Sequence, residues 1–547
     1  MNRLQASAIL LLLWAAIYLP GLGSTEIKGE EGRRILPAIT MLETGDWIVP
    51  HIGGKPFLRK PPLINWAIAG SMKLTGMRNE WAARLPSALC VLALAGAMVA
   101  VSGRRERTIF TTDVSFIAAV MVMTQFGLLA KARLAGAEIE GLYVPLAGIA
   151  TVLWMGWWVQ GRSPWLTWTV PWIFLGLGLL AKAPLHLLFF YALVVAVLWK
   201  AGEWRALWHP AHLAGMALML GIFAAWAVPY FRSEAAMEAA KVWQDQFAGR
   251  VTENVFDWRS WLLNIPRGLL DQLPWVLFAP LLWVRRCEWS GREGALIRGA
   301  LIALPLCFFG LLLVPGVLTR YVLPIGVPLA MLLALALAEE KLDPPSEVLR
   351  PWWQVNIGLG GLLLVIAVAG PIGVAIAFRR ITAETGELLP TGATLLTWPL
   401  LASAVTVIVA LPIVLARRRF ARPTRIAGAS GALFGAAAML YAADAVPFIN
   451  RADDIRPLAR RIDAAVPAGQ ELVLYDPGWQ PAIVYLQTRY RYAPVMEAIP
   501  ADAEFVLARA AAEKKFTEKR SDLAVRERIS GKTKSEQFLL YERRSPK

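Results

Sequence analysis

Long uninterrupted apolar stretches are the feature that most restricts how this 547-residue chain can fold. A helix needs roughly 20 apolar residues to cross the hydrocarbon core of a bilayer, and blocks of Leu, Ala, Val, Trp and Phe of that order recur along the chain. Such runs exclude a transmembrane β-barrel, whose strands alternate in hydrophobicity. Since only 18% of the residues are charged, against about a quarter in soluble domains, we predict an all-α polytopic membrane protein.

The apolar stretches predict about 13 transmembrane helices. They cover residues 6–23, 84–102, 110–130, 141–160, 165–181, 183–199, 212–230, 273–285, 297–316, 321–338, 355–378, 395–416 and 426–447. The stretch 273–285 is short, and 165–199 is divided only by Lys182 and Pro184, so the count is good to one or two. Arginine-rich loops mark the cytoplasmic side by the positive-inside rule, which places the N-terminus inside and, for an odd count, the C-terminus outside.

Three polar segments fall on the non-cytoplasmic side: a first loop (24–80), a second loop (231–272) and a tail (448–547). We expect a transmembrane domain over residues 1–447 and a small extracytoplasmic α/β domain over 448–547. In the tail, Ile455, Leu458 and Ile462 form the apolar face of a predicted helix. The segments ELVLYD, EFVLA and FLLYE are predicted strands.

Charge and composition indicate which classes of molecule this protein binds. The net charge of +16 is concentrated in loops beside apolar spans, which favours anionic lipid head groups and phosphate-bearing lipids over nucleic acid. The three cysteines and four histidines show no spacing typical of a metal site. We therefore expect neither a metal nor a cofactor.

The first loop holds the strongest candidate site. Ile35, Ile39 and Leu42 recur at helical spacing over residues 30–44, which indicates an amphipathic helix in the membrane interface. Glu30 and Glu31 stand at its start, where acidic side chains are favoured by the helix dipole. A carboxylate at a membrane surface can also act as a general base for a hydroxyl acceptor. Charge placement alone favours the first interpretation and leaves the second open.

An ordered set of motifs changes that balance. The acidic pair is followed by Arg, then by GDWIVP, KPPL, Trp and AARLPSAL, and later by KARLAGAEIEGLYVPLAG, LGLGLLAKAPLHLL, TRYVLPIGVPLAML and IVYLQTRYRYAP. This set resembles the polyprenyl-phosphate-sugar glycosyltransferases, which include protein O-mannosyltransferases and bacterial lipid A aminoarabinose transferases. The resemblance covers most of the chain, and it implies a GT-C-like fold. Any single motif would be weak evidence, so the order carries the inference.

The resemblance implies two catalytic carboxylates. Glu30 matches the general base, and Glu138 matches the acidic residue of an Arg-x-x-x-x-Asp motif. The family has Asp at both positions, so each carboxylate here lies one methylene further from the backbone. Glu31, Arg33 and Arg133 are implied as supporting residues that orient the pair or balance its charge.

The resemblance also implies a donor-phosphate site. Lys60 in KPPL, Arg250 in VWQDQFAGRVTEN and Tyr321 in RYVLP match phosphate-contacting residues of the family. Each has a plainer interpretation, as a snorkelling lysine, a solvated helix arginine and an aromatic-belt tyrosine. Arg59 precedes Lys60 where the aminoarabinose branch has an acidic residue. Lys182 is either a functional charge within the membrane or a residue at the outer end of two short helices.

These observations predict an enzyme of the bacterial inner membrane. It would move a sugar from an undecaprenyl-phosphate-type donor to a lipid, glycan or protein hydroxyl at the outer face, with inversion and without a metal. The chain has no GxxxxGK[ST] loop and no Rossmann fingerprint, which suits a lipid-linked rather than a nucleotide-linked sugar. Two alternatives remain: a transporter or flippase for a lipid-linked anion, and an inactive lipid-binding assembly protein. The lack of an internal repeat disfavours the first, and the retained carboxylates disfavour the second.

Overall fold

Helices make up most of the chain in the computed structural model. The structure describes residues 1–547 except 28, 58–59, 104–107, 135, 183, 234–257, 286–288, 315, 339–344, 386–391, 417–421, 454, 532–535 and 545–547. Two of the predicted positions, Arg59 and Arg250, therefore lie outside the described residues. The chain divides into a helical unit (Met1–Leu22, Arg84–Val228 and Trp243–Pro447) and a sheet unit (Gly23–Ala83, Pro229–Val242 and Phe448–Lys547).

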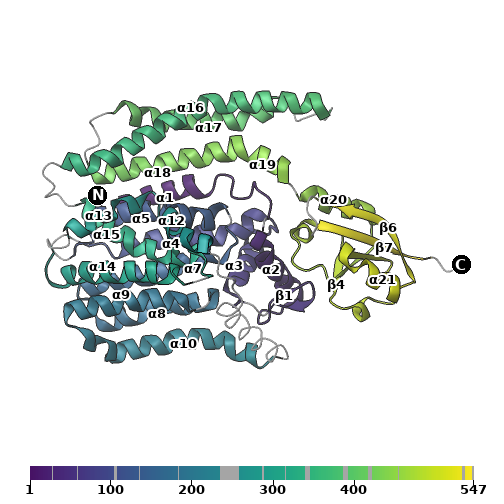
Figure 1. The fold of residues 1–547 in the computed structure, drawn as a ribbon, viewed down its shortest axis with the longest axis horizontal. Helices are drawn as coiled ribbons and strands as arrows, with labels where there is room; N and C mark the ends of the chain where they lie inside the picture. Colours follow the sequence, from purple (N-terminus) through teal and green to yellow (C-terminus); the bar gives the residue numbers. More distant parts are fainter. Residues whose placement is uncertain are drawn as a thin grey trace. The chain divides into compact units, whose positions relative to one another are not determined.

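The helical unit is a bundle of long apolar helices (Figure 1). Among these, α16 packs along α17, and α14 packs along α9. The principal helices are α1 (Arg3–Tyr18), α4 (Glu80–Ala100), α5 (Thr112–Met123), α6 (Phe126–Leu129), α7 (Ile139–Val159), α8 (Pro164–Ala181), α9 (Leu185–Ala201), α10 (Pro210–Phe231), α12 (Trp258–Asp271), α13 (Ala279–Arg285), α14 (Gly291–Leu312), α15 (Gly326–Ala338), α16 (Pro345–Thr385), α17 (Gly392–Leu415) and α18 (Pro423–Leu440). Two short elements matter for the site: the π-turn η2 (Ala130–Leu134) and the 3-10 segment η5 (Thr319–Ile325).

The predicted membrane architecture is confirmed in outline, but the count of 13 is not. Within the described residues, nine helices are long and apolar enough to cross a membrane, or ten if the pair Thr112–Met123 and Phe126–Leu134, bent by 57°, forms one span. Two further predicted spans, α1 and α9, are shorter apolar helices. The stretch 273–285 forms only η4 (Trp275–Phe278) and the seven-residue α13. Pro274 and Pro280 stand at or near the starts of these two pieces, where a ring without an N–H disfavours one continuous helix.

The sheet unit combines the first loop with the tail. The first loop forms η1 (Gly29–Glu31), α2 (Gly32–Thr44), the hairpin β1 (His51–Ile52) and β2 (Lys55–Pro56), and α3 (Leu63–Thr75). The tail forms α19 (Val446–Asp453), α20 (Arg456–Ala465), β3 (Leu472–Tyr475), β4 (Tyr490–Ala493), β5 (Phe505–Arg509), α21 (Glu513–Lys519), β6 (Leu523–Ser530) and β7 (Gln537–Arg543). Its five-stranded sheet has the order β4-β3-β5-β7-β6. Strand β3 runs parallel to β4 and β5, while β7 is antiparallel to β5 and β6.

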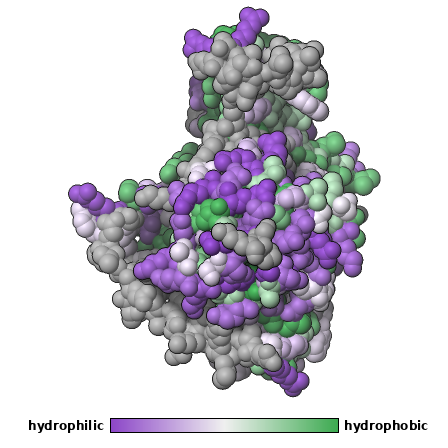
Figure 2. All heavy atoms as spheres, turned by 90° about the vertical axis from the view of Figure 1, so that its right-hand side faces the viewer, coloured by the Kyte–Doolittle hydropathy of each residue, from purple (hydrophilic) through white to green (hydrophobic). Residues whose placement is uncertain are grey.

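The tail prediction is confirmed in its α/β character. The expected apolar helix face is buried at α20, and the three predicted strand segments overlap β3, β5 and β7. Leu36 of α2 joins the same hydrophobic core as Leu458, Ile462 and Leu474. The first loop is thus grouped with the tail in one unit of the structure. The predicted boundary at residue 447 coincides with the start of the tail portion of this unit, Phe448–Lys547. Hydrophilic residues predominate on the face of this unit turned to the viewer in Figure 2.

The predicted amphipathic helix of the first loop is α2. Ile35 and Ile39 are buried on it, as their spacing predicts. The helix ends at Gly45, which adopts a left-handed conformation with φ of 75° that glycine tolerates without a steric penalty. Because η1 precedes this helix directly, the acidic pair Glu30 and Glu31 stands at its N-terminal end.

Candidate functional site

Four segments of the helical unit bring charged side chains together. These segments are η2, the start of α7, the turn between α8 and α9, and η5. They contribute Lys131, Glu138, Glu140, Lys182, Arg320 and Tyr321, which we call the charged cluster. All four segments lie where an apolar helix begins or ends or is interrupted. The polar side chains of the cluster therefore come from interruptions of the apolar helices.

Glu140 is the most buried carboxylate of the charged cluster. Its side chain is only 6% exposed, and Lys182, 8% exposed, donates a hydrogen bond of 2.8 Å from Nζ to its Oε1. The Nε atom of Arg320 lies 3.1 Å from the same oxygen. The ammonium of Lys182 also lies 4.4 Å from the centre of the Tyr321 ring. Pairing of this kind is what permits charges to be buried, because an unpaired buried charge is strongly unfavourable.

Glu138 occupies the N-cap position of α7, but its carboxylate makes no capping hydrogen bond in the described structure. Instead, Lys131 donates a hydrogen bond of 2.9 Å from Nζ to its Oε2. Arg320 Nη1 lies 3.9 Å from the same oxygen. Arg320 therefore stands between Glu138 and Glu140, with one nitrogen near each.

Asp271 is the last residue of α12, and it interacts electrostatically with Lys131 of the charged cluster. Burial raises its pKa, while a hydrogen bond with the Thr319 side chain and the positive charge of Lys131 act in the opposite direction. The net result is a raised pKa, which works against ionisation of this group.

Arg133 has a different environment from Lys131, although both belong to η2. Its guanidinium donates hydrogen bonds to the carbonyl oxygens of Ile17 (2.7 Å), Pro20 (2.8 Å) and Ala438 (3.3 Å). These bonds tie η2 to the end of α1 and to α18. In the structure it is Lys131, two residues earlier, that contacts Glu138, so the contacts of Arg133 give it a structural role.

In the sheet unit, Glu30 is held by arginines of α2. The Nη1 atom of Arg33 donates to both carboxylate oxygens, at 2.8 and 3.1 Å, and Arg34 Nη2 lies 3.7 Å away. The guanidinium of Arg33 lies over the ring of Trp479, 4.4 Å from its centre. Glu30 is 37% exposed, so it is accessible while its orientation is restrained from one side.

The tail fastens the first loop at two further places. The hydroxyl of Tyr485 accepts a 2.8 Å hydrogen bond from the Ile27 N–H and donates one of 2.8 Å to Glu80. Near the hairpin, Asp476 accepts from Lys55 Nζ at 2.8 Å and from Arg509 Nη2 at 3.3 Å. These contacts fix both flanks of the segment that carries Glu30.

The chain is similar to known proteins in sequence and in fold. Residues 59–228 match the family described as dolichyl-phosphate-mannose-protein mannosyltransferase. The undecaprenyl phosphate-alpha-4-amino-4-deoxy-L-arabinose arabinosyl transferase of Pseudomonas aeruginosa strain LESB58 is 27% identical over 371 residues, which cover 66% of this chain and 65% of that protein. The chain therefore matches slightly less than two thirds of that relative's length. The protein of the same description from Enterobacter sp. strain 638 is 26% identical over 399 residues, covering 69% of this chain and 67% of that protein.

The solved structures add evidence on the fold. The crystal structure of ArnT from Cupriavidus metallidurans bound to undecaprenyl phosphate aligns with a TM-score of 0.65 at 18% identity, covering 98% of this chain and 97% of that one. In sequence and in fold the chain is similar to glycosyltransferases of the GT-C type that use polyprenyl-phosphate sugars. The resemblance drawn from the motifs is thereby confirmed, and so is the multi-pass architecture.

The predicted site residues of this chain fall into two groups. Glu30, Glu31, Arg33 and Lys60 belong to the sheet unit, and Glu138, Arg133 and Tyr321 belong to the helical unit. Glu31 is buried, and Lys60 is half-buried directly before the two prolines that lead into α3. The structure brings Glu30 together with Arg33, and it brings Glu138 together with Tyr321 in the charged cluster. Their catalytic roles remain predictions.

Glu140 and Arg320 belong to the charged cluster, but they were not predicted as site residues from the sequence. Both stand beside predicted site residues, Glu138 and Tyr321. Two acidic residues at the start of an apolar span, with a lone lysine between two later spans, were the available signal, because buried charges in a membrane need opposite partners. Lys182 itself is the C-cap residue of α8, so it lies in the break between two helices rather than inside one.

Proposed function

We propose that this protein is a glycosyltransferase of the bacterial inner membrane. It takes a sugar from a polyprenyl-phosphate donor of the undecaprenyl type and places it on the hydroxyl of a lipid, glycan or protein acceptor at the outer face. The observation that carries the proposal is the charged cluster, in which the buried pair Glu140 and Lys182 lies beside Arg320 and Tyr321. Support comes from its relatives, which are described as aminoarabinose transferases with an undecaprenyl-phosphate donor.

The chemistry follows from the groups present. The acceptor hydroxyl oxygen bonds to the anomeric carbon as the bond from that carbon to the phosphate oxygen breaks, and the hydroxyl proton passes to Glu30 as general base. Direct displacement inverts the anomeric centre. Negative charge grows on the departing phosphate, and side-chain cations held in position stabilise it. Glu138 and Glu140 hold Lys131 and Lys182 at hydrogen-bonding distance, so these ammonium groups are oriented before the reaction begins.

Side-chain cations would take the role in this protein that a divalent ion has in other transferases. Within the described residues there is no group of three or more His, Cys, Asp or Glu side chains placed to hold a metal ion. Lys60 is the proposed phosphate contact of the first loop, and Tyr321 that of the helical unit. The outer-face assignment rests on the arginine-rich loops, which the positive-inside rule assigns to the cytoplasm.

Native mass spectrometry of the purified chain tests this function. We expect the wild type to carry a polyprenyl phosphate or a polyprenyl-phosphate sugar, Lys60→Ala to lose it, and Glu30→Gln to retain the intact donor. The bound mass then identifies the sugar. A wild type that carries no such lipid, even when it is supplied, would overturn the proposal, and the transporter and assembly-protein alternatives would then be tested by lipid flipping in vesicles.

A further inference from the structure

Arg320 is the least firmly held cation of the charged cluster. Lys131 and Lys182 each donate a hydrogen bond to a carboxylate, at 2.9 and 2.8 Å. Arg320 instead approaches Glu140 at 3.1 Å and Glu138 at 3.9 Å. Among the described residues, its buried Nε–H finds no acceptor in hydrogen-bonding geometry, despite the nearness of Glu140. Its side chain is 34% exposed, which is more than the side chains of Lys131 (24%) and Lys182 (8%).

A guanidinium in this state has unused binding capacity. Arginine presents five N–H donors in a planar fork, which matches the oxygens of a phosphate group. The two carboxylates attract the guanidinium of Arg320 by charge, yet neither accepts a hydrogen bond from Nε. The guanidinium is therefore oriented while at least one of its donors stays unused. Tyr321, the adjacent residue in η5, brings the same segment to Lys182.

The charges of the cluster also leave room for an anion. Lys131, Lys182 and Arg320 provide three positive charges, and Glu138 and Glu140 provide two negative ones. Asp271, beside Lys131, has a raised pKa and so ionises less readily than an ordinary aspartate. The cluster thus attracts additional negative charge, and Arg320 is the most exposed of its three cations.

We infer that Arg320 binds the phosphate of the polyprenyl carrier and favours the doubly charged phosphate left after sugar transfer over the singly charged sugar phosphodiester. This inference rests on the proposed function. When the bond between the sugar carbon and the phosphate oxygen breaks, the electron pair stays on that oxygen, and the phosphate charge changes from −1 to −2. A cation that binds the second charge more strongly than the first stabilises the transition state more than the bound donor.

Binding measurements with two probes test the role of Arg320 without requiring turnover. One probe is a short-chain polyprenyl phosphate, and the other is its methyl ester, which keeps one negative charge at all relevant pH values. Both are titrated into the full chain in nanodiscs at pH 8, where a phosphate monoester, with a second pKa of about 6, carries two charges. We expect the wild type to prefer the monoester. We expect Arg320→Gln to weaken monoester binding about tenfold, the size of one charge-assisted hydrogen bond, and to change methyl-ester binding little.

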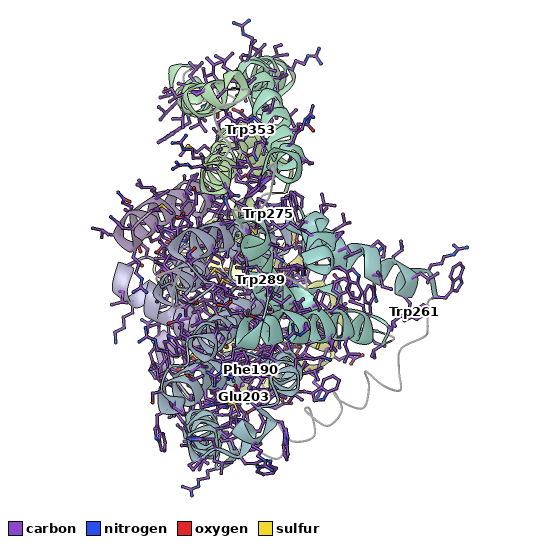
Figure 3. The ribbon with its side chains drawn as sticks, turned by 90° about the vertical axis from the view of Figure 1, so that its left-hand side faces the viewer. Phe190, Glu203, Trp261, Trp275, Trp289 and Trp353 are labelled. Atoms are coloured by element: carbon purple, nitrogen blue, oxygen red, sulfur yellow. The ribbon has the colours of Figure 1, made fainter. Side chains whose placement is uncertain are left out.

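A pH profile and two further variants sharpen the test. The wild-type preference should diminish as pH falls through about 6, because the monoester then takes up a proton, and Arg320→Gln should show no such change. Arg320→Lys keeps the charge without the fork and should lose part of the preference. The matched control is Arg292→Gln, which removes an ion pair of 2.9 Å with Glu203 in the same unit. Glu203 is labelled in Figure 3. This variant should leave both affinities unchanged.

The outcomes separate this inference from the proposed function. A wild type that binds neither probe overturns both. A wild type that binds both probes, with Arg320→Gln lowering the two affinities equally or not at all, overturns the inference and leaves the function standing. Thermal unfolding identifies a variant that fails to fold. If Arg320→Gln does so, Arg320→Lys decides the question, since an unchanged preference in that variant also overturns the inference.

Discussion

The guanidinium of Arg33 lies 4.4 Å above the ring centre of Trp479 while it donates two hydrogen bonds to Glu30. A tail residue is thus linked to the proposed general base through one arginine. Because Trp479 is linked to Glu30 through Arg33, we regard it as a positioning residue. The ring limits where Arg33 can place its charge, and Arg33 in turn limits the orientation of the carboxylate.

Replacing Trp479 should therefore lower kcat more than it changes KM. A cation–π contact at a partly exposed site contributes about 0.5–1 kcal/mol, which corresponds to a decrease of about two- to fivefold in rate for Trp479→Ala. Trp479→Phe keeps an aromatic face and should recover most of that loss. The measurement is steady-state sugar transfer from a purified donor lipid. Trp204→Ala, which removes a ring stacked by Arg205 in the helical unit, is the control, and an equal effect there would contradict the positioning role.

Removing one member of the buried pair in the charged cluster should be strongly destabilising. Glu140→Gln keeps the side-chain size but removes the carboxylate that pairs with Lys182 and Arg320, and Arg320 then has the more distant Glu138 nearby. Breaking a buried ion pair from one side costs about 3–5 kcal/mol. We expect a lower unfolding temperature and loss of transfer activity. Adding Lys182→Met to Glu140→Gln should restore part of the stability, because the buried ammonium that has lost the Glu140 carboxylate is then removed. It should restore none of the activity, because the cation proposed to stabilise the phosphate is also absent.

Thermal unfolding in detergent measures that double-mutant cycle. Additive losses in the two single variants and the double variant would show that the two residues are not coupled. The matched comparison is the exposed pair Arg292 and Glu203, where Arg292→Gln should change the unfolding temperature little.

The apolar helices could be predicted from the sequence because the bilayer imposes a length and a hydrophobicity that are readable one segment at a time. The tail strands β3, β5 and β7 and the buried face of α20 could also be predicted, because their apolar residues recur at the spacing of a strand or a helix. The contacts of the site are of another kind. Glu140 and Lys182 are separated by 42 positions, and Arg33 meets a tryptophan of the tail, so no local pattern reports either pair.

Arg133 donates to carbonyl oxygens, whereas Lys131 donates to Glu138, for a local reason. A regular helix would place its side chains at predictable angles, but residues 130–134 form a π-turn, which changes the direction in which each side chain leaves the backbone. Lys131 consequently meets Glu138, and Arg133 meets the carbonyl oxygens near the end of α1. Motif spacing identifies that a cation is needed here, but it does not say which one reaches the carboxylate.

Asp476 offers a test of backbone strain next to the first loop. Its φ of 38° lies in the left-handed region, which Asn and Gly tolerate and β-branched residues do not. Asp476→Asn loses only half-exposed ion pairs with Lys55 and Arg509, so a loss below about 1 kcal/mol is expected. Asp476→Val adds steric strain of about 1–2 kcal/mol. Thermal unfolding should rank the wild type, Asn and Val in that order, and equal values for the two variants would contradict the strain argument.

Tyr485 should make the stability of the sheet unit depend on alkaline pH. Burial is the main cause that raises its pKa in the folded state, and the negative charge of Glu80 adds to the effect. A raised pKa means that the folded state holds the proton more tightly than the unfolded state. The stability that this contributes is full below about pH 10, the ordinary tyrosine pKa, and it is lost as pH rises from there toward the folded-state value.

The variant Tyr485→Phe separates this effect from other titrations. It removes the hydroxyl that accepts from the Ile27 N–H and donates to Glu80, so stability at pH 8 should fall by about 1–3 kcal/mol. Between pH 10 and 11 its stability should decline less steeply than that of the wild type, because one of the groups that lose protons on unfolding is absent. Chemical unfolding followed across this pH range measures both quantities. Parallel pH profiles for the two proteins would show that the Tyr485 hydroxyl does not titrate differently in the folded and unfolded states.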